Sequence, residues 1–277
     1  MLIGLIALLS LAAALGISYG TVGFSALWWI PVTVLGYLVC FTLGLALVFL
    51  FLWLLARSID PSVPQTEDSR FMRGVARLVC PAVFTLLCCK VETKGLEQLP
   101  KQGRFMLVCN HLGILDPILL LAKLPQAQLA FVSKQENEDI FIVGKLMHRI
   151  LTQKIDRDND REALKTILSC IQIIKEDKAS IAAFPEGYTS TDHRLHKFRN
   201  GVFKIAQRTH VPIVVCTVTG TEQVFRNFFH HRRSKVTLHL LQVLSPEELA
   251  GHNTTQMGDR VHALMEADLP PAYRPEV

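Results

Sequence analysis

Residues 104–124 read RFMLVCNHLGILDPILLLAKL: a short apolar run, a turn and a longer apolar run. The first run ends at Asn110 and has the length of a buried strand, whereas the second has the length of a helix. His111 directly follows the strand, and Asp116 precedes Pro117, a pair that favours a helix start with the carboxylate at the N-cap. These residues therefore predict a strand, a turn that carries a histidine and a carboxylate, and a helix.

The same alternation of strand and helix continues along the chain. It predicts an α/β domain with a mainly parallel sheet flanked by helices. Ligands of such sheets bind beyond the carboxyl ends of the strands, so we expect the chemistry in the loops that follow Asn110, Asp156, Phe184 and Thr217. The expected strands are residues 104–110, 128–133, 154–156, 180–184, 212–218 and 235–244, and the expected helices are residues 117–124, 136–150, 160–177, 201–209 and 255–267.

A segment without charge precedes this domain. All 29 Lys and Arg, all 24 Asp and Glu and all 10 His lie after Ala56. As helices, residues 2–19 would be about 27 Å long and residues 28–55 about 40 Å long, against a hydrocarbon core of about 30 Å. Residues 2–19 also have the length of a secretory signal, but they lack its basic start. We therefore expect residues 1–56 to form an N-terminal transmembrane helical hairpin.

The region after the hairpin is basic and sets the expected orientation. By the positive-inside rule, its arginines place the following domain on the cytoplasmic side of a membrane. Residues 57–90 are expected to form a connector and, over residues 69–80, an amphipathic helix on the head-group layer, with an ordinary surface helix as the alternative. Residues 91–277 then form the α/β domain. The arginines are Arg57, Arg70, Arg73 and Arg77.

His111 and Asp116 are the candidate catalytic residues. Each alone is more often structural, but together they allow the carboxylate to accept from Nδ1 of the imidazole and leave Nε2 as a base. The sequence has no G-x-S-x-G motif, and Cys109 lies in an apolar strand, so no protein nucleophile accompanies the pair. The base is therefore expected to act on a hydroxyl group of the substrate.

Two further loops carry candidate binding residues. Arg157 follows a predicted strand, where a guanidinium can bind a phosphate in bidentate fashion, unless it pairs with a neighbouring aspartate. In the Phe-Pro-Glu-Gly run at residues 184–187, Gly187 lets backbone amides approach an anion, and Glu186 can order an arginine or accept from a substrate hydroxyl.

Metal sites are not expected. The acidic run that begins at Asp156 is not a calcium loop, because its sixth position is Arg161 and its twelfth is Ile167. The 7 cysteines are odd in number and include no C-x-x-C pair, which disfavours both a zinc site and a closed disulfide set.

The stretch from residue 190 to residue 235 is strongly basic, with nine Lys and Arg against Asp192 and Glu222. It is either a solvated face or a surface for anionic lipid heads, coenzyme phosphates or an acidic carrier protein. Nucleic acid is not an expected partner, because no recognised binding motif accompanies the charge.

Four short motifs at the predicted strand ends resemble, in order, the four blocks of the glycerolipid acyltransferases. They are His-x4-Asp, Ile-Asp-Arg, Phe-Pro-Glu-Gly and the Val-Pro-Ile-Val run at residues 211–214. Over residues 91–244 the chain is most similar to the 1-acylglycerol-3-phosphate acyltransferase family. The resemblance implies that His111 is the catalytic base, Asp116 its orienting acid, and Arg157, Glu186 and Gly187 the acceptor-binding set.

The resemblance also implies the reaction. A fatty acyl group passes from an acyl thioester, on coenzyme A or acyl carrier protein, to the free hydroxyl of a lysophospholipid such as 1-acylglycerol-3-phosphate, giving phosphatidic acid without a resident cofactor. Backbone N–H groups of residues 111–115 are candidate oxyanion donors. A lipid or thioester hydrolase with the same pair, and a non-catalytic lipid-binding protein, remain alternatives.

One block departs from the family pattern. The third block commonly continues Glu-Gly-Thr-Arg, whereas Tyr188 and Thr189 fill the last two places here. An arginine expected near the acceptor phosphate is therefore missing, and either Arg194 or Lys197 is a candidate to replace it.

Overall fold

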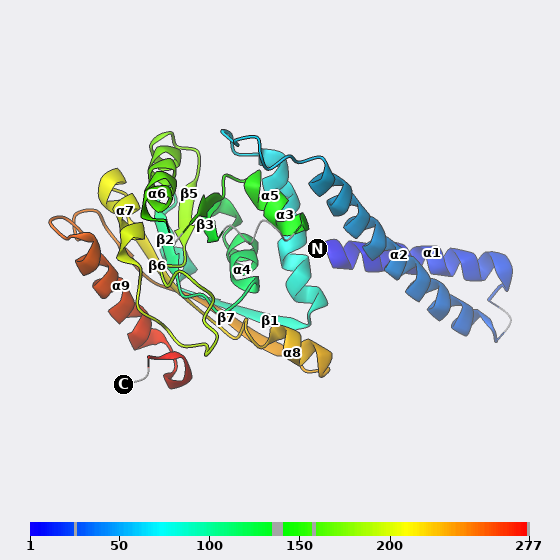
Figure 1. Ribbon diagram of the computed structural model, residues 1–277. Coiled ribbons are helices and arrows are strands. Elements are labelled where there is room, and N and C mark those ends of the chain that lie inside the picture. Colours follow the sequence, from blue (N-terminus) through cyan, green and yellow to red (C-terminus); the bar gives the residue numbers. More distant parts are fainter. Residues whose placement is uncertain (25–26, 135–140, 157–158, 276–277) are drawn as a thin grey trace. The chain divides into compact units, whose positions relative to one another are not determined.

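The chain folds as two compact units (Figure 1). In this computed structural model the described residues are 1–24, 27–134, 141–156 and 159–275. The first unit is Met1–Ser62 and the second is Val63–Val277. Most of the connector expected over residues 57–90 therefore belongs to the same unit as the α/β domain.

The first unit is a pair of apolar helices, α1 (Leu2–Thr21) and α2 (Trp29–Arg57). Both are long and apolar enough to cross a bilayer, which is consistent with the expected hairpin and with membrane anchoring. A glycine lets the two backbones approach, since a Cβ on Gly44 would lie 2.7 Å from Cγ2 of Ile6. The pair is therefore closely packed at this crossing.

The helix expected over residues 69–80 extends further, as α3 (Arg70–Leu86). One face packs on the α/β unit through buried residues that include Phe84. The opposite face leaves Phe71 and Leu78 exposed. Residence of this helix on a membrane surface stays a prediction.

The guanidinium of Arg73 ties α3 to the rest of the unit. It pairs with Asp68 at 3.0 Å and donates to the backbone carbonyls of Leu129 at 2.5 Å and Ile150 at 3.3 Å. Arg73 is only 8% exposed, and burial lowers the pKa of its guanidinium, a shift that Asp68 opposes. Unlike Arg77 on the same helix, Arg73 is therefore not part of an exposed basic face.

The second unit is built on a seven-stranded sheet in the order β1-β7-β6-β2-β5-β3-β4. The strands from β2 to β6 run parallel to one another, as expected for a mainly parallel sheet, whereas β7 runs antiparallel to β6 and carries β1 on its other edge. The bounds are β1 (Cys89–Lys94), β2 (Met106–Cys109), β3 (Leu129–Lys134), β4 (Gln153–Ile155), β5 (Ser180–Ala183), β6 (Ile213–Thr219) and β7 (Ser234–Leu244).

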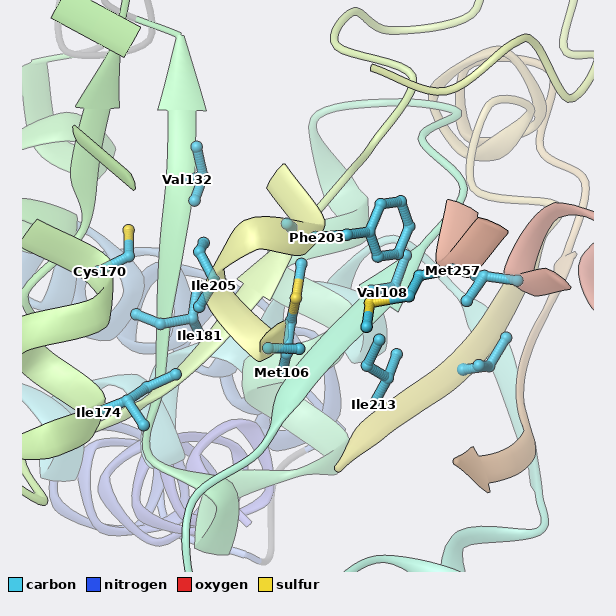
Figure 2. Close-up of a cluster of buried hydrophobic side chains, with 14 of the residues drawn as sticks. Met106, Val108, Val132, Cys170, Ile174, Ile181, Phe203, Ile205, Ile213 and Met257 are labelled. Carbon is cyan, nitrogen blue, oxygen red and sulfur yellow. The ribbon is translucent and has the colours of Figure 1, made fainter. Parts of the chain in front are cut away.

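Helices cover both faces of this sheet (Figure 1), as the continuously apolar strands predict. Successive residues of β2 enter opposite cores, with Met106 in one and Leu107 in the other. Figure 2 shows the first core, where Ile174, Ile205 and Met257 come from three different helices. The helices are α4 (Leu115–Lys123), α5 (Phe141–His148), α6 (Asp160–Lys175), α7 (Lys204–Thr209), α8 (Val224–Phe229) and α9 (Thr254–Asp268).

Some expected elements differ in detail. The helix expected over residues 201–209 begins as a 3₁₀ turn, Asn200–Phe203, before α7. The helix expected over residues 136–150 corresponds to α5, and its first residues lie outside the described part of the chain. The strand β1 and the helix α8 had no predicted counterpart, because β1 is polar and α8 has only 6 residues.

We expect the substitution Arg73→Met to lower the free energy of unfolding by about 3–5 kcal/mol, because the half-buried carboxylate of Asp68 and two buried carbonyls lose their partner. Urea unfolding in detergent, followed by circular dichroism, measures this change. Arg77→Met, on the same helix but exposed, is the control and should cost no more than about 1 kcal/mol. Equal losses in the two variants would contradict a special role for Arg73.

Candidate active site

The candidate residues that the structure describes meet at the carboxyl ends of three neighbouring strands. His111 follows β2, Glu186 and Gly187 follow β5, and the loop from Gly220 to Gln223 follows β6. Because β6, β2 and β5 are adjacent and parallel, their ends lie at one edge of the sheet. The His-x4-Asp and Phe-Pro-Glu-Gly motifs therefore come together where the sheet topology predicts a ligand site, whereas the Val-Pro-Ile-Val run lies at the opposite, amino end of β6.

His111 and Asp116 form a hydrogen-bonded pair. Nδ1 of His111 lies 2.8 Å from Oδ2 of Asp116, and the side chains are 14% and 0% exposed. A carboxylate can only accept, so Nδ1 carries the proton and Nε2 is left with its lone pair. In the described part of the chain, Nε2 has no hydrogen-bond partner. The pair is thus arranged as a base with an orienting acid.

The carboxylate of Asp116 is held from several directions. Its Oδ2 also accepts from the N–H groups of Leu112 at 2.6 Å and Gly113 at 2.8 Å, while Oδ1 accepts from the Thr221 hydroxyl at 2.5 Å. The helix begins at Leu115, so Asp116 is its second residue and not the N-cap that the sequence predicted. The carboxylate therefore organises the turn before the helix and the loop after β6.

Asn110 joins the same two strands. Its side-chain amide donates to the carbonyl of Val218 at 3.0 Å and accepts from the N–H of Val218 at 2.8 Å. Asn110 is 2% exposed. Its two hydrogen bonds to Val218 extend the bonding between β2 and β6 beyond Cys109, the last residue of β2. The amide thereby aligns the start of the histidine turn with the loop that carries Thr221.

Glu186 holds the backbone of His111 from the other side. Its Oε1 accepts from the N–H of His111 at 2.9 Å, and its Oε2 accepts from the N–H of His196 at 3.0 Å. The N–H of Ser190 donates to the carbonyl of His111 at 2.9 Å. Both backbone polar groups of His111 are therefore fixed by the loop after β5, which makes Glu186 a positioning residue in this structure.

Burial dominates the titration of Glu186. It raises the pKa of this carboxyl group from its usual 4.5 to about 7, against the N–H groups of His111 and His196, which lower it. The side chain is 1% exposed. Glu186 is therefore a buried acid with a pKa near neutral pH, next to the His111–Asp116 pair.

An aromatic ring fixes the plane of the imidazole. The rings of His111 and Phe184 stack with centroids 4.2 Å apart and planes at 20°. Phe184 also stacks on Phe131, with centroids 6.5 Å apart. Together with the bond to Asp116, this stack restricts the imidazole to one orientation.

Gly187 makes room for an arginine. Its φ is +87°, which favours glycine, and a Cβ at this position would lie 2.8 Å from Cδ of Arg199. Phe184, Gly187 and Arg199 also line a cavity of about 260 Å³, whose other walls are mostly apolar. A cationic side chain therefore lies beside the Glu-Gly loop, although position 189 is a threonine.

Three further residues are relevant as binding groups or nucleophiles. Arg157 lies outside the described residues. Cys109 is fully buried, and burial raises the pKa of its thiol well above the ordinary range. The Ser190 hydroxyl donates to Asp192 at 2.8 Å. Neither group is poised as a nucleophile beside His111, in agreement with the absence of a nucleophile motif.

Comparison with known proteins agrees with the fold and with the family resemblance of the sequence. Residues 90–219 match the family model described as Acyltransferase. The 1-acyl-sn-glycerol-3-phosphate acyltransferase of Cocos nucifera is 27% identical over 175 residues, which are 63% of this chain and 56% of that protein. The probable 1-acyl-sn-glycerol-3-phosphate acyltransferase of Mycoplasma pneumoniae is 30% identical over 188 residues, 66% of each protein.

A solved structure is also similar. The 1-acyl-sn-glycerophosphate (LPA) acyltransferase PlsC from Thermotoga maritima superposes with a TM-score of 0.59 at 22% identity, covering 70% of this chain and 77% of that chain. This likeness concerns the fold. The chain spans about half to two thirds of the length of the curated relatives it matches.

The sheet, the histidine turn and its buried carboxylate together define an α/β domain of the acyltransferase class. The chain belongs to the acyltransferase family that contains the 1-acyl-sn-glycerol-3-phosphate acyltransferases.

We expect Thr221→Val to lower the free energy of unfolding by about 1–3 kcal/mol, because Oδ1 of Asp116 loses its buried donor. Thermal unfolding in detergent measures the loss. Thr221→Ser keeps the hydroxyl and should stay within about 1 kcal/mol of the wild type. A valine variant as stable as the serine variant would contradict this role of the hydroxyl.

The raised pKa of Glu186 predicts that the stability of the folded protein depends on pH. Since its folded pKa of about 7 exceeds the unfolded value near 4.5, the folded state keeps a proton that the unfolded state has lost between these values. Stability is then lost as pH rises from about 4.5 to 7, by an amount on the order of 3 kcal/mol.

The matching measurement is the melting temperature (Tm) from pH 4.5 to pH 8 for the wild type and Glu186→Gln. The amide cannot accept from both N–H groups, so this variant melts lower at pH 5, but its Tm should fall less with rising pH. Parallel profiles for the two proteins would contradict the assignment.

Proposed function

We propose that this chain transfers a fatty acyl group from an acyl thioester to the free hydroxyl of a lysophospholipid. The observation that carries the proposal is the His111–Asp116 pair, whose Nε2 is left to take a proton while Nδ1 is held at 2.8 Å from the buried carboxylate. The names of the curated relatives support a glycerolipid acceptor.

The reaction proceeds by direct transfer. Nε2 of His111 removes the proton of the acceptor hydroxyl as its oxygen bonds to the thioester carbonyl carbon, and Asp116 stabilises the resulting imidazolium. When the carbon–sulfur bond breaks, the sulfur leaves as a thiolate. The imidazolium of His111 gives its proton to this thiolate and becomes neutral again. The burial of Cys109 supports a mechanism without an acyl-enzyme.

The turn amides divide between structural and chemical roles. The N–H of His111 donates to Glu186, and those of Leu112 and Gly113 donate to Asp116. These three amides are already engaged, which narrows the oxyanion donors proposed within residues 111–115 to the amides of Ile114 and Leu115 at the start of α4.

The acceptor is proposed to be 1-acylglycerol-3-phosphate, with phosphatidic acid as the product. Arg199, which lies against Gly187, supplies a cation where Thr189 replaces the arginine of the family pattern. Arg199 lines the cavity beside the Glu-Gly loop, and we therefore prefer it to Arg194 and Lys197 for this role. Arg157 and Gly187 remain proposed contacts of the acceptor, while Glu186 acts by positioning His111.

The donor and the location complete the proposal. The donor is an acyl group on coenzyme A or acyl carrier protein, which brings its own activated thioester, so the transfer needs no resident cofactor. The two apolar helices support a membrane location, and the arginines after α2 support a domain on the cytoplasmic side.

We expect His111→Ala and Asp116→Asn to lower kcat/KM for acyl transfer by about 10²–10⁴-fold, because each removes general-base catalysis. Incubation of the purified protein with acyl-CoA and a panel of lysolipids, read by mass spectrometry, measures the acylated products. Arg208→Gln, a change outside this site, is the control and should keep full turnover. Retained turnover in the His111 variant would refute the mechanism.

The same products separate transfer from hydrolysis. Release of free fatty acid without any acylated lipid, even with lysolipid in excess, would show that water is the acceptor and would identify the chain as a hydrolase. Absence of both products in native lipid would favour a non-catalytic lipid-binding protein.

A further inference from the structure

The segment between β6 and β7 exposes large aromatic side chains. In α8, Phe225 is 45% exposed, Phe228 39% and Phe229 73%, whereas Val224 is fully buried and fixes the helix to the unit. Most large apolar residues of an α/β unit lie in its core, so three exposed phenylalanines on one short helix are a feature to be explained.

The same segment is basic. Residues 224–234 contain three arginines, two histidines and no acidic residue. Arg226, Arg232 and Arg233 are all exposed, and within the described part of the chain their guanidinium groups have no ion-pair partner. We call Phe225, Arg226, Phe228, Phe229, Arg232 and Arg233 the aromatic–basic patch.

The patch continues toward the end of α3. Cys89 of β1 pairs with Ser234 of β7, so the end of α3 and the turn before β7 lie at the same corner of the sheet (Figure 1). Leu86, the last residue of α3, is 39% exposed. A further exposed apolar residue therefore lies at the corner that carries the aromatic–basic patch.

Aromatic rings among arginines match the chemistry of an anionic bilayer surface. Phenylalanines insert at the boundary between head groups and acyl chains, while arginines bind the phosphates above them. A soluble anion would need only the arginines, and the same chain carries two helices long and apolar enough to cross a bilayer. We propose that the aromatic–basic patch is a docking surface for anionic lipid head groups of the membrane.

A short connection joins this patch to the candidate active site. α8 begins three residues after Thr221, whose hydroxyl is bonded to Oδ1 of Asp116. The N–H of Val224 donates to the carbonyl of Thr221 at 3.3 Å. If the proposed acyl transfer holds, docking also brings the catalytic pair to the layer where a lysolipid presents its hydroxyl.

Hydrogen exchange of the full chain tests the docking. The protein is placed in nanodiscs of phosphatidylcholine, with or without phosphatidylglycerol, and exchange is read by mass spectrometry. We expect peptides over residues 224–233 to exchange about tenfold more slowly in the anionic discs, and 0.5 M salt to remove most of this difference. The variant F228S/F229S/R232Q/R233Q should lose it.

The matched control removes two exposed leucines and two exposed lysines from another part of the unit, as L164S/L168S/K101Q/K175Q. This variant should keep the protection of residues 224–233. Equal exchange in neutral and anionic discs, or equal loss of protection in both variants, would overturn the proposal. Protection that appears only when acyl carrier protein is added to neutral discs would also overturn it, in favour of a protein partner.

A kinetic readout connects docking with turnover. The patch variant should show a several-fold higher KM for lysolipid presented in anionic discs and an unchanged kcat for lysolipid in detergent micelles. The exchange measurement does not require turnover, so it tests the docking surface even if the proposed acyl transfer fails. An unchanged KM in the patch variant would contradict the link between docking and substrate access.

Discussion

The structure around the site depends on one buried carboxylate. Asp116 is 0% exposed and accepts four hydrogen bonds, from the His111 ring, two backbone amides and the Thr221 hydroxyl. A buried charge is stable only when such donors surround it. The turn after β2, the first turn of α4 and the loop after β6 are therefore constrained together, and the imidazole takes its orientation from that constraint.

The rest of the site supports this arrangement through backbone contacts. Glu186 and the N–H of Ser190 bind the two polar backbone groups of His111, and the Asn110 amide binds both polar backbone groups of Val218. In this structure these residues hold the backbone on both sides of the histidine turn. The parallel sheet makes this possible because it brings the ends of β6, β2 and β5 to one edge.

The sequence predicts the parts of the site that are local. His111, Asp116 and the Glu-Gly loop follow recognisable strands, and parallel strands place such loops together. Thr221 and Asn110 could not be found this way, because their partners are 105 and 108 residues away. A glutamate after a strand indicates chemistry but does not indicate that its two oxygens bind backbone amides.

The fold is predictable to a similar extent. Apolar runs predict the central strands. The pattern of apolar and polar residues along a strand is the same whichever way the strand runs, so the residues of β7 do not indicate that it is antiparallel to β6. Helical spacing groups Arg73 with exposed arginines, although tertiary packing buries it. The helix α8 has 6 residues, too few for a periodic pattern, and only the charge of the region marks it.

The distance along the chain between Asp116 and Thr221 has a consequence for biosynthesis. A growing polypeptide releases the histidine turn from the ribosome long before β6 and Thr221, which follows β6 and lies 105 residues after Asp116. Until that strand is translated and added to the sheet, the nascent domain has no completed site. The hydrogen-bond set of Asp116 is thus completed late in synthesis, after the two apolar helices have already left the ribosome.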